Sequence, residues 1–306
     1  MPQIDDRAEA SADGSAAGPQ RRKIKKLQVM VADVIRETPD SATLVLFTGN
    51  DQLHYKPGHF LTIDPHQFPA LERFLQYFEE IKGKREPARA YSLSSAPHET
   101  YLAITVKEEY YLSGRTRFPP LLSPLLVWRT PRGTTMEVTG FGGPYVLPDD
   151  IEDRTDHVVH ICAGSGIVPN WSILKDAVAR DLDVRHTVIY GNKTYDDIIF
   201  RSQLEEFERR HTGKVAVHHA LSREQDAASY GDRFRAGRID RELIASAIPD
   251  PSAVEVFVCG PGISKWDRVL AKEQGIDPQP RFLESALAAL DALGVPKERV
   301  HHESYG

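Results

Sequence analysis

The 306 residues are 41% hydrophobic and 27% charged, which is typical of a soluble globular protein and suggests about two domains. A net charge of −6 argues against a nucleic-acid partner. The one basic cluster, at residues 21–26, is short and does not change this conclusion. No run approaches the roughly 18 apolar residues of a membrane span. The amino-terminus also lacks the apolar core of a signal peptide, so we expect a cytoplasmic protein with no membrane partner.

The first part of the chain predicts an antiparallel sheet. Residues 1–22 begin with a stretch rich in alanine, serine, glycine and aspartate, and we expect them to be disordered. Within 23–150, glycine and proline separate short alternating runs: "KLQVMVADVIRE", "ATLVLFTG", "HFLTIDP", "TYLAITVKE" and "TTMEVTGFGGP". This spacing favours a barrel or a sandwich.

Residues 69–83, "PALERFLQYFEEIKG", interrupt that pattern with apolar residues at helical spacing and a glycine at the end. We therefore predict a helical insert. Most such helices cover the side of a barrel, and a lid or docking role is the alternative interpretation.

The stretch "ARAYSLSSAP", residues 88–97, allows two interpretations. It alternates too loosely for an amphipathic strand. One interpretation is a turn with ordinary surface residues. The other is that the arginine, the phenol and the hydroxyl of Arg89, Tyr91 and Ser92 follow one ligand.

Residues 151–306 predict a different architecture. Strand-like apolar runs alternate with helical patterns, for example "HVVHICA" before "PNWSILKDAVARD", which indicates a parallel sheet covered on both faces. The segment "LPDDIEDRTD" between the two halves is a plausible linker.

The second part also carries a phosphate-binding pattern, "ICAGSGIVPNW". Gly164 and Gly166 follow a strand and allow the backbone to approach a pyrophosphate, and Pro169 suits the first turn of the next helix. The last glycine of the usual dinucleotide fingerprint is missing, so a tight turn is the alternative interpretation.

Cys162 and Cys259 are too few for a four-thiolate iron–sulfur cluster within one chain, and neither has a second thiol nearby for a zinc site. We therefore expect no metal. Each ends an apolar run, where a buried, inert thiol is the simplest interpretation.

Several motifs, in order from about residue 25 to the last residue, resemble those of the ferredoxin–NADP⁺ reductase family. Arg89-Ala90-Tyr91-Ser92 is similar to its flavin-binding signature, and "KPGHFLTI", with Pro57 and Gly58, resembles the strand before the flavin ring. "AGSGIVP", "YGNKTYDDIIF" and "FVCGPG" resemble the nucleotide-binding segments, and "HHESYG" resembles the carboxy-terminal Glu-x-aromatic.

The resemblance implies an antiparallel Greek-key flavin-binding barrel over residues 23–150, followed by a parallel-sheet NAD(P)-binding domain over 151–306. It also implies an enzyme that passes hydride from NADPH, or NADH, to FAD and then single electrons to a separate acceptor. That acceptor is expected to be an iron–sulfur or flavodoxin-type protein, such as a ferredoxin or an oxygenase component.

The resemblance further implies roles for individual residues on the flavin side. Arg89 pairs with the flavin phosphate, Tyr91 packs on the flavin and bonds its ribityl chain, and Ser92 lies near N5. Ser123 stands where the family holds the FAD pyrophosphate. The glycine usual in that turn is absent here, which leaves FMN as an alternative.

On the nicotinamide side, the resemblance implies that Cys259 lies beside the ring and that Gly260 and Pro261 continue the nicotinamide loop. A buried strand-end thiol is the alternative interpretation of Cys259. Glu303 is implied as a polar or proton-relaying group near Ser92, and Tyr305 as an aromatic that covers the flavin and yields during turnover. The 2′-phosphate of NADPH is expected at Ser222 and Arg223, with added charge from the loop arginines Arg233 and Arg235.

Two other functions remain open. The chain could be a flavin-containing electron-transfer or regulatory subunit without its own nicotinamide turnover. It could also be a nucleotide-binding interaction module without flavin, although the presence of Arg89, Tyr91 and Ser92 argues against that.

Overall fold

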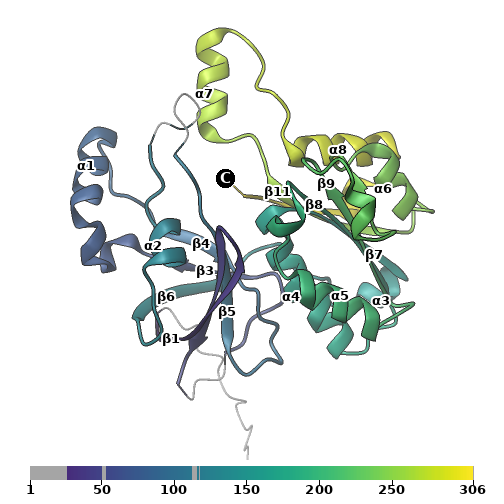
Figure 1. Ribbon diagram of the computed structural model, residues 1–306, viewed down its shortest axis with the longest axis horizontal. Helices are drawn as coiled ribbons and strands as arrows, with labels where there is room; N and C mark the ends of the chain where they lie inside the picture. Colours follow the sequence, from purple (N-terminus) through teal and green to yellow (C-terminus); the bar gives the residue numbers. More distant parts are fainter. Residues whose placement is uncertain (1–25, 50–52, 112–115, 117, 306) are drawn as a thin grey trace, which may run out of the picture.

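The structure is a computed structural model that describes residues 26–49, 53–111, 116 and 118–305. The predicted disorder of residues 1–22 lies outside these residues. These described residues form two sheets of six strands each, which lie side by side (Figure 1). Among the described helices, none is long and apolar enough to cross a membrane.

The first sheet is antiparallel and closes on itself. Its strands are β1 (Leu27–Thr38), β2 (Ser41–Phe47), β3 (Phe60–Ile63), β4 (Arg89–Ser92), β5 (Leu102–Lys107) and β6 (Thr135–Gly142), in the order β4-β3-β6-β1-β2-β5. An antiparallel bridge between Leu93 and Ile104 joins the two edge strands and makes the sheet a barrel. Alternate side chains such as Leu44, Leu61 and Val138 are fully buried inside it.

The predicted insert is helical. After the short 3₁₀ turns Pro65–Gln67 and Pro69–Leu71, helix α1 runs from Glu72 to Lys82 and ends at Gly83 in the left-handed conformation. It buries Leu75 and Phe78 against the barrel core but leaves Phe74 and Ile81, which share the apolar spacing, about half exposed.

The second sheet is parallel throughout. Its strands are β7 (His157–Ala163), β8 (Arg185–Asn192), β9 (Val215–Leu221), β10 (Phe234–Ala236), β11 (Glu255–Pro261) and β12 (Val300–Tyr305), in the order β10-β9-β8-β7-β11-β12. The antiparallel barrel followed by a parallel sheet is the predicted fold class.

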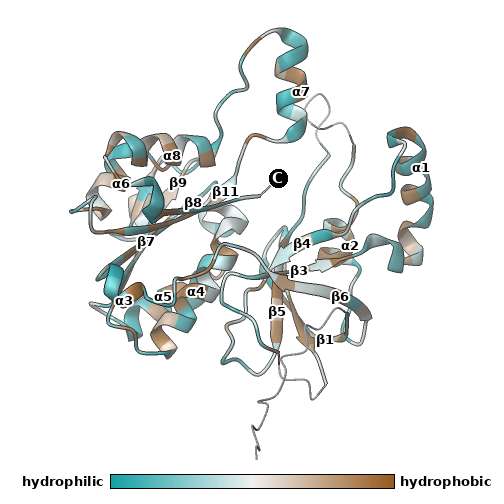
Figure 2. Ribbon diagram, turned by 180° about the vertical axis from the view of Figure 1, so that it is seen from behind, coloured by the Kyte–Doolittle hydropathy of each residue, from teal (hydrophilic) through white to brown (hydrophobic). Residues whose placement is uncertain are grey.

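Helices cover both faces of the parallel sheet. Helices α4 (Ile167–Ala179) and α5 (Arg201–Arg210) pack on one face, and α6 (Arg241–Ala247) and α8 (Phe282–Ala292) on the other. The short helices α2 (Ser123–Trp128) and α3 (Ile151–Arg154) lie in the connections. Helix α7 (Lys265–Gln274) projects away from the parallel sheet and is mostly hydrophilic (Figure 2). By contrast, strand β5 of the barrel is largely hydrophobic (Figure 2).

Polar contacts between the barrel and the helices of the second sheet hold the two parts together. Ser172 Oγ on α4 donates to the carbonyl oxygen of Ser95 at 2.6 Å, and Lys175 forms an ion pair with Glu99. These contacts fix how the end of β4 faces the end of β12. The domain boundary predicted at residue 150 falls between β6 and α3 and stays a prediction.

Candidate functional site

The end of the barrel strand β4 meets the carboxy-terminal strand β12. Tyr305 donates a hydrogen bond from its phenol to Ser92 Oγ at 2.5 Å, and Ser92 Oγ donates to Glu303 Oε2 at 3.5 Å. Alternate residues of a strand share one face, so Glu303 and Tyr305 both point toward the barrel. Figure 1 shows the carboxy-terminus between the two sheets. Three residues predicted from two separate motifs therefore form one cluster.

Burial changes the acidity of this cluster. It raises the pKa of Glu303 to about 7, against a smaller opposing effect of the hydrogen bond from Ser92. A carboxyl with this pKa exchanges its proton near neutral pH, which suits it to hold or release a proton beside Ser92. Burial also raises the pKa of the Tyr305 phenol well above its ordinary value, so that group stays a neutral donor.

Cys259 lies in register with Glu303 on the neighbouring strand β11. Its side chain is fully buried, and burial raises the pKa of its thiol well above the ordinary value. Cys162, in register with Cys259 on β7, is equally buried and its pKa is raised by the same cause. Both are neutral thiols at physiological pH. Cys259 differs from Cys162 in that it adjoins the Ser92 cluster.

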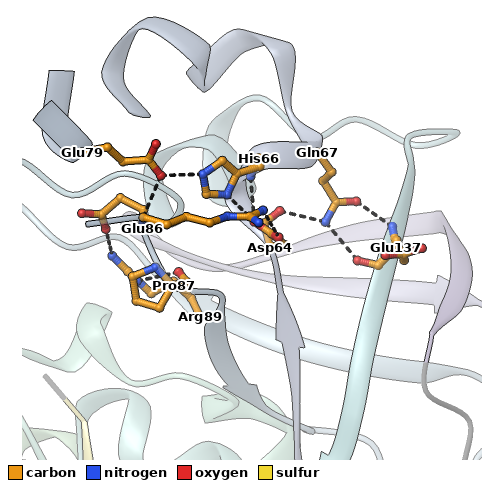
Figure 3. A network of polar contacts seen from close by, with 9 residues as sticks. Asp64, His66, Gln67, Glu79, Glu86, Pro87, Arg89 and Glu137 are labelled. Carbon is orange, nitrogen blue, oxygen red and sulfur yellow. Dashed lines mark hydrogen bonds and ion pairs between the residues drawn. The ribbon is translucent and has the colours of Figure 1, made fainter. Parts of the chain in front are cut away.

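The remaining residues of the β4 motif lie on the barrel wall. Tyr91 packs against the barrel core, and burial raises the pKa of its phenol. Arg89 donates from Nη2 to Glu86 Oε2 at 2.6 Å and from Nη1 to the carbonyl oxygen of Pro87 at 2.7 Å (Figure 3). Ala90 is exposed and pairs with Thr62 of β3. The motif therefore presents one cation, one phenol and one hydroxyl along a single strand.

Pro57 and Gly58 are buried in the turn before β3. Gly58 has a φ of +92°, and an added Cβ would lie 2.0 Å from the carbonyl oxygen of Tyr145. Packing against Tyr145 therefore accounts for this glycine by itself. A contact of Pro57 or Gly58 with the flavin ring stays a prediction.

Ser123 opens helix α2 and is buried. Its Oγ accepts a hydrogen bond from the backbone N–H of Glu109 at 3.1 Å. The protein thus uses one acceptor site of this hydroxyl. The predicted role at the pyrophosphate stays a prediction.

The glycine turn after β7 lies against Cys259. Residues Gly164–Gly166 form a 3₁₀ turn before α4, and an added Cβ on Gly166 would lie 2.0 Å from the carbonyl oxygen of Cys259. Pro169 is buried in the first turn of α4, as its missing N–H permits. The absence of a side chain at Gly166 thus brings the predicted pyrophosphate turn next to the predicted nicotinamide strand.

The two residues after Cys259 also lie at this junction. An added Cβ on Gly260 would lie 2.5 Å from the ring of Phe282, so this glycine lets α8 approach the strand end. Pro261 is exposed and lies in register with Tyr305.

The predicted 2′-phosphate residues lie apart from this cluster, after strand β9. Ser222 and Arg223 are exposed, and their backbone N–H groups donate to the carbonyl oxygens of Asn192 and Lys193. Arg233 instead forms an ion pair with Glu208, and Arg235 with Asp240. The expectation that these two arginines add free charge therefore needs correction, because nearby carboxylates already compensate both.

Sequence reasoning missed two buried polar atoms near these sites. Among the described residues, Ser94 Oγ and Asn192 Nδ2 have no hydrogen-bond partner. Ser94 follows the β4 motif, and Asn192 ends β8 beside Ser222. Buried polar atoms are usually hydrogen-bonded, so unpaired ones beside these motifs are suited to hydrogen-bond a polar ligand there. Ser94 lies within the quoted "ARAYSLSSAP", which is the one signal that could have identified it.

Comparison with known proteins agrees with this arrangement. Residues 160–264 match the family described as the oxidoreductase NAD-binding domain. The matched residues include most of β7, all of β8 to β11, the glycine turn and Cys259.

Among curated proteins, the chain is 31% identical over 169 residues to NADH-cytochrome b5 reductase 2-B of Vanderwaltozyma polyspora, covering 54% of this chain and 53% of that protein. It is 29% identical over 290 residues to the ferredoxin reductase component of 3-ketosteroid-9-alpha-monooxygenase of Mycolicibacterium smegmatis, covering 91% of this chain and 65% of that protein. The chain thus spans between about half and two thirds of the length of these relatives.

Solved structures share the fold of nearly the whole chain. The FAD/NAD binding domain of nitric oxide dioxygenase from Vibrio cholerae superposes with a TM-score of 0.66 at 20% identity, covering 92% of this chain and 99% of that one. Ferredoxin-NADP+ reductase from Plasmodium falciparum gives a TM-score of 0.61 at 21% identity, covering 92% and 96%. The predicted fold class and the resemblance to this family are confirmed.

Proposed function

We propose that the protein is a flavin-dependent NAD(P)H oxidoreductase that takes hydride from NADPH, or from NADH, onto FAD and passes single electrons to a separate acceptor. The observation that carries this proposal is the meeting of Ser92 with Glu303 and Tyr305, beside Cys259 and the glycine turn. It places a hydroxyl from the barrel and a titratable carboxyl from the other sheet at one junction.

The residues of β4 have the chemistry to hold a flavin. Arg89 would bind its phosphate, Tyr91 its ribityl chain, and Ser92 the polar edge of its ring. The unpaired hydroxyl of Ser94 adds a further donor in the same stretch. When bound, the flavin supplies hydride acceptance and one-electron release, and the protein supplies position and exclusion of water.

Glu303 and Ser92 would manage a proton at this junction. With a pKa of about 7, Glu303 is present in both protonation states at neutral pH. Ser92 can accept from Tyr305 while it donates to Glu303, so its hydroxyl connects the two groups. The buried Cys259 would pack beside the junction as a neutral side chain and would not act as a nucleophile, because its thiol stays protonated.

We infer a preference for NADPH from Ser222 and Arg223. A 2′-phosphate needs hydroxyl and guanidinium partners, and both side chains are exposed at the end of β9. Glu224 follows directly and weakens the positive charge, so NADH is the second substrate that we expect the protein to accept.

The electron acceptor is proposed to be a separate iron–sulfur or flavodoxin-type protein. Two cysteines cannot hold a four-thiolate cluster within these 306 residues, so an iron–sulfur acceptor would lie outside them. The relative from Mycolicibacterium smegmatis is named as the ferredoxin reductase component of a monooxygenase, which supports an oxygenase-type partner.

The visible spectrum of the purified protein, before and after anaerobic NADPH and NADH, tests this proposal. We expect flavin absorbance that bleaches on addition of NADPH. A flavin band that neither nucleotide bleaches would favour an electron-transfer subunit instead. A colourless protein that also fails to bind added FAD would reject the proposal.

A further inference from the structure

Arg89 is held by a carboxylate that lies just after the helical insert. Glu86 follows α1 and its turn, and its Oε2 accepts from Arg89 Nη2 at 2.6 Å, while the carbonyl oxygen of Pro87 accepts from Nη1. Both ends of the guanidinium fork are therefore fixed by residues two and three positions before Arg89. Pro87 also restricts Glu86 to an extended backbone, which limits how this carboxylate can move.

Glu86 is itself enclosed. Its side chain is only 2% exposed, and Lys82 Nζ at the end of α1 approaches Glu86 Oε1 at 2.5 Å. Burial alone would raise the pKa of Glu86, but hydrogen bonds from Lys82 and Arg89 outweigh it and the pKa is lowered. Glu86 is therefore an anion at neutral pH that is paired on both oxygens.

The backbone of Glu86 is held as well. Its N–H donates to Glu79 Oε1 at 2.8 Å, and Glu79 Oε1 also contacts His66 Nε2 at 2.7 Å (Figure 3). His66 Nδ1 in turn contacts Asp64 Oδ1 at 2.6 Å, just after strand β3. This network connects α1 to the barrel and leaves Glu86 little freedom.

The other side of Arg89 is accessible. These contacts use two of the five N–H donors of a guanidinium, and 38% of the side chain is exposed. Lys82 compensates the charge of Glu86, so the group of three keeps a net positive charge for an anion. A buried ion pair rarely stabilises a fold more than apolar packing would, so its fixed geometry suits a positioning role.

We propose that Glu86 and Lys82 are positioning residues that hold the guanidinium of Arg89 in place for the phosphate group of a bound flavin. This inference rests on the proposed function, because it requires that the barrel bind a flavin. The free edge of Arg89 then meets the phosphate without first losing side-chain freedom, which strengthens binding.

Flavin affinity measured with three ligands tests the inference. Dissociation constants for FAD, FMN and riboflavin would be measured on apoprotein for the wild type, Glu86→Ala, Glu86→Gln, Arg89→Ala and the double variant Glu86→Ala/Arg89→Ala. Riboflavin carries the ring and ribityl chain but no phosphate. Glu80→Ala is the matched control, because Glu80 is an exposed carboxylate on α1, the helix that carries Lys82.

We expect Glu86→Ala to weaken FAD and FMN about tenfold, as the loss of one charge-assisted contact implies, and to leave riboflavin unchanged. Glu86→Gln keeps an acceptor oxygen, so it should fold like the wild type. Its loss of FAD and FMN affinity should be smaller than that of Glu86→Ala. In the Arg89→Ala background, Glu86→Ala should have no further effect. Glu80→Ala should behave as the wild type.

Three results would each overturn the inference. Glu86→Ala could weaken the binding of all three flavins equally, it could still weaken binding in the Arg89→Ala background, or it could bind FAD more tightly than the wild type. Those results would leave flavin binding by the wild type intact. A wild type that binds none of the three flavins would instead overturn the proposed function together with this inference.

Discussion

The phenol of Tyr305 donates to Ser92 Oγ at 2.5 Å, so the carboxy-terminal strand of the parallel sheet closes onto a strand of the barrel. The contact crosses 213 positions in the sequence. If flavin binds along β4, this phenol occupies the approach to Ser92 and must yield to a nicotinamide ring.

Replacing Tyr305 tests that displacement. Tyr305→Ser should tighten nicotinamide nucleotide binding to the oxidised protein and shift the flavin absorption band, because the competing ring is gone. Ring stacking contributes roughly 0.5–1.5 kcal/mol, so the gain should be severalfold and measurable by titration. Tyr305→Phe keeps the ring and loses only the bond to Ser92, so it should resemble the wild type. Unchanged affinity and spectrum in Tyr305→Ser would mean that the tail does not contact the flavin.

The raised pKa of Glu303 predicts how stability depends on pH. Burial raises this pKa from 4.5 to about 7, so the folded state favours the protonated acid. The contribution of Glu303 to the free energy of unfolding is fully present below pH 4.5 and is lost as the pH rises through 7. Glu303→Gln should therefore match the wild type near pH 4.5 and exceed it by about 2–3 kcal/mol at pH 8, measured by urea unfolding.

The exposed Glu298 provides the control, and Glu298→Gln should track the wild type at both pH values. A Glu303→Gln protein less stable than the wild type at pH 8 would contradict a buried, proton-accepting carboxyl.

The close approach of Gly166 to strand β11 predicts a steric cost. The Cβ of Gly166→Ala would lie 2.0 Å from the carbonyl oxygen of Cys259, so the turn or the strand must move. We expect a loss of about 2 kcal/mol or more in unfolding free energy and weaker NADPH binding. At Gly142, an added Cβ meets nothing within 4 Å, so Gly142→Ala should change stability by less than about 0.5 kcal/mol. Equal stability of the two variants would refute this packing.

Nucleotide preference should depend on Arg223. Because a guanidinium can pair with the 2′-phosphate, Arg223→Ala should raise the KM for NADPH about tenfold and leave that for NADH nearly unchanged. Arg235→Ala is the control, since Arg235 is paired with Asp240 and should affect neither substrate. An equal rise in both KM values for Arg223→Ala would remove the assignment.

The fold and the Ser92 cluster were predictable because they depend on ordered local motifs. Alternation, repeated strand–helix units and the glycine turn each act within a few residues, and the β4 and tail motifs named Ser92, Glu303 and Tyr305. Pairings between distant or unremarkable residues were not predictable. Glu86 showed nothing in the sequence to indicate that it holds Arg89.

The exposure of Phe74 and the pairing of Arg233 with Glu208 were also not predictable, because both depend on contacts between distant parts of the chain. Helical spacing says which residues share a stripe, but not how much of the stripe the barrel covers. Likewise, a loop arginine looks free in sequence until a helix brings a carboxylate to it.

The most direct test of the Ser92 junction as the reaction site is anaerobic single-turnover reduction. Wild-type protein and Ser92→Ala, each loaded with FAD, would be mixed with NADPH while the flavin band is followed. We predict that Ser92→Ala retains FAD but bleaches about 100-fold more slowly, since the polar group between Glu303 and the ring is lost. Bleaching of Ser92→Ala at the wild-type rate, with FAD still bound, would contradict the account.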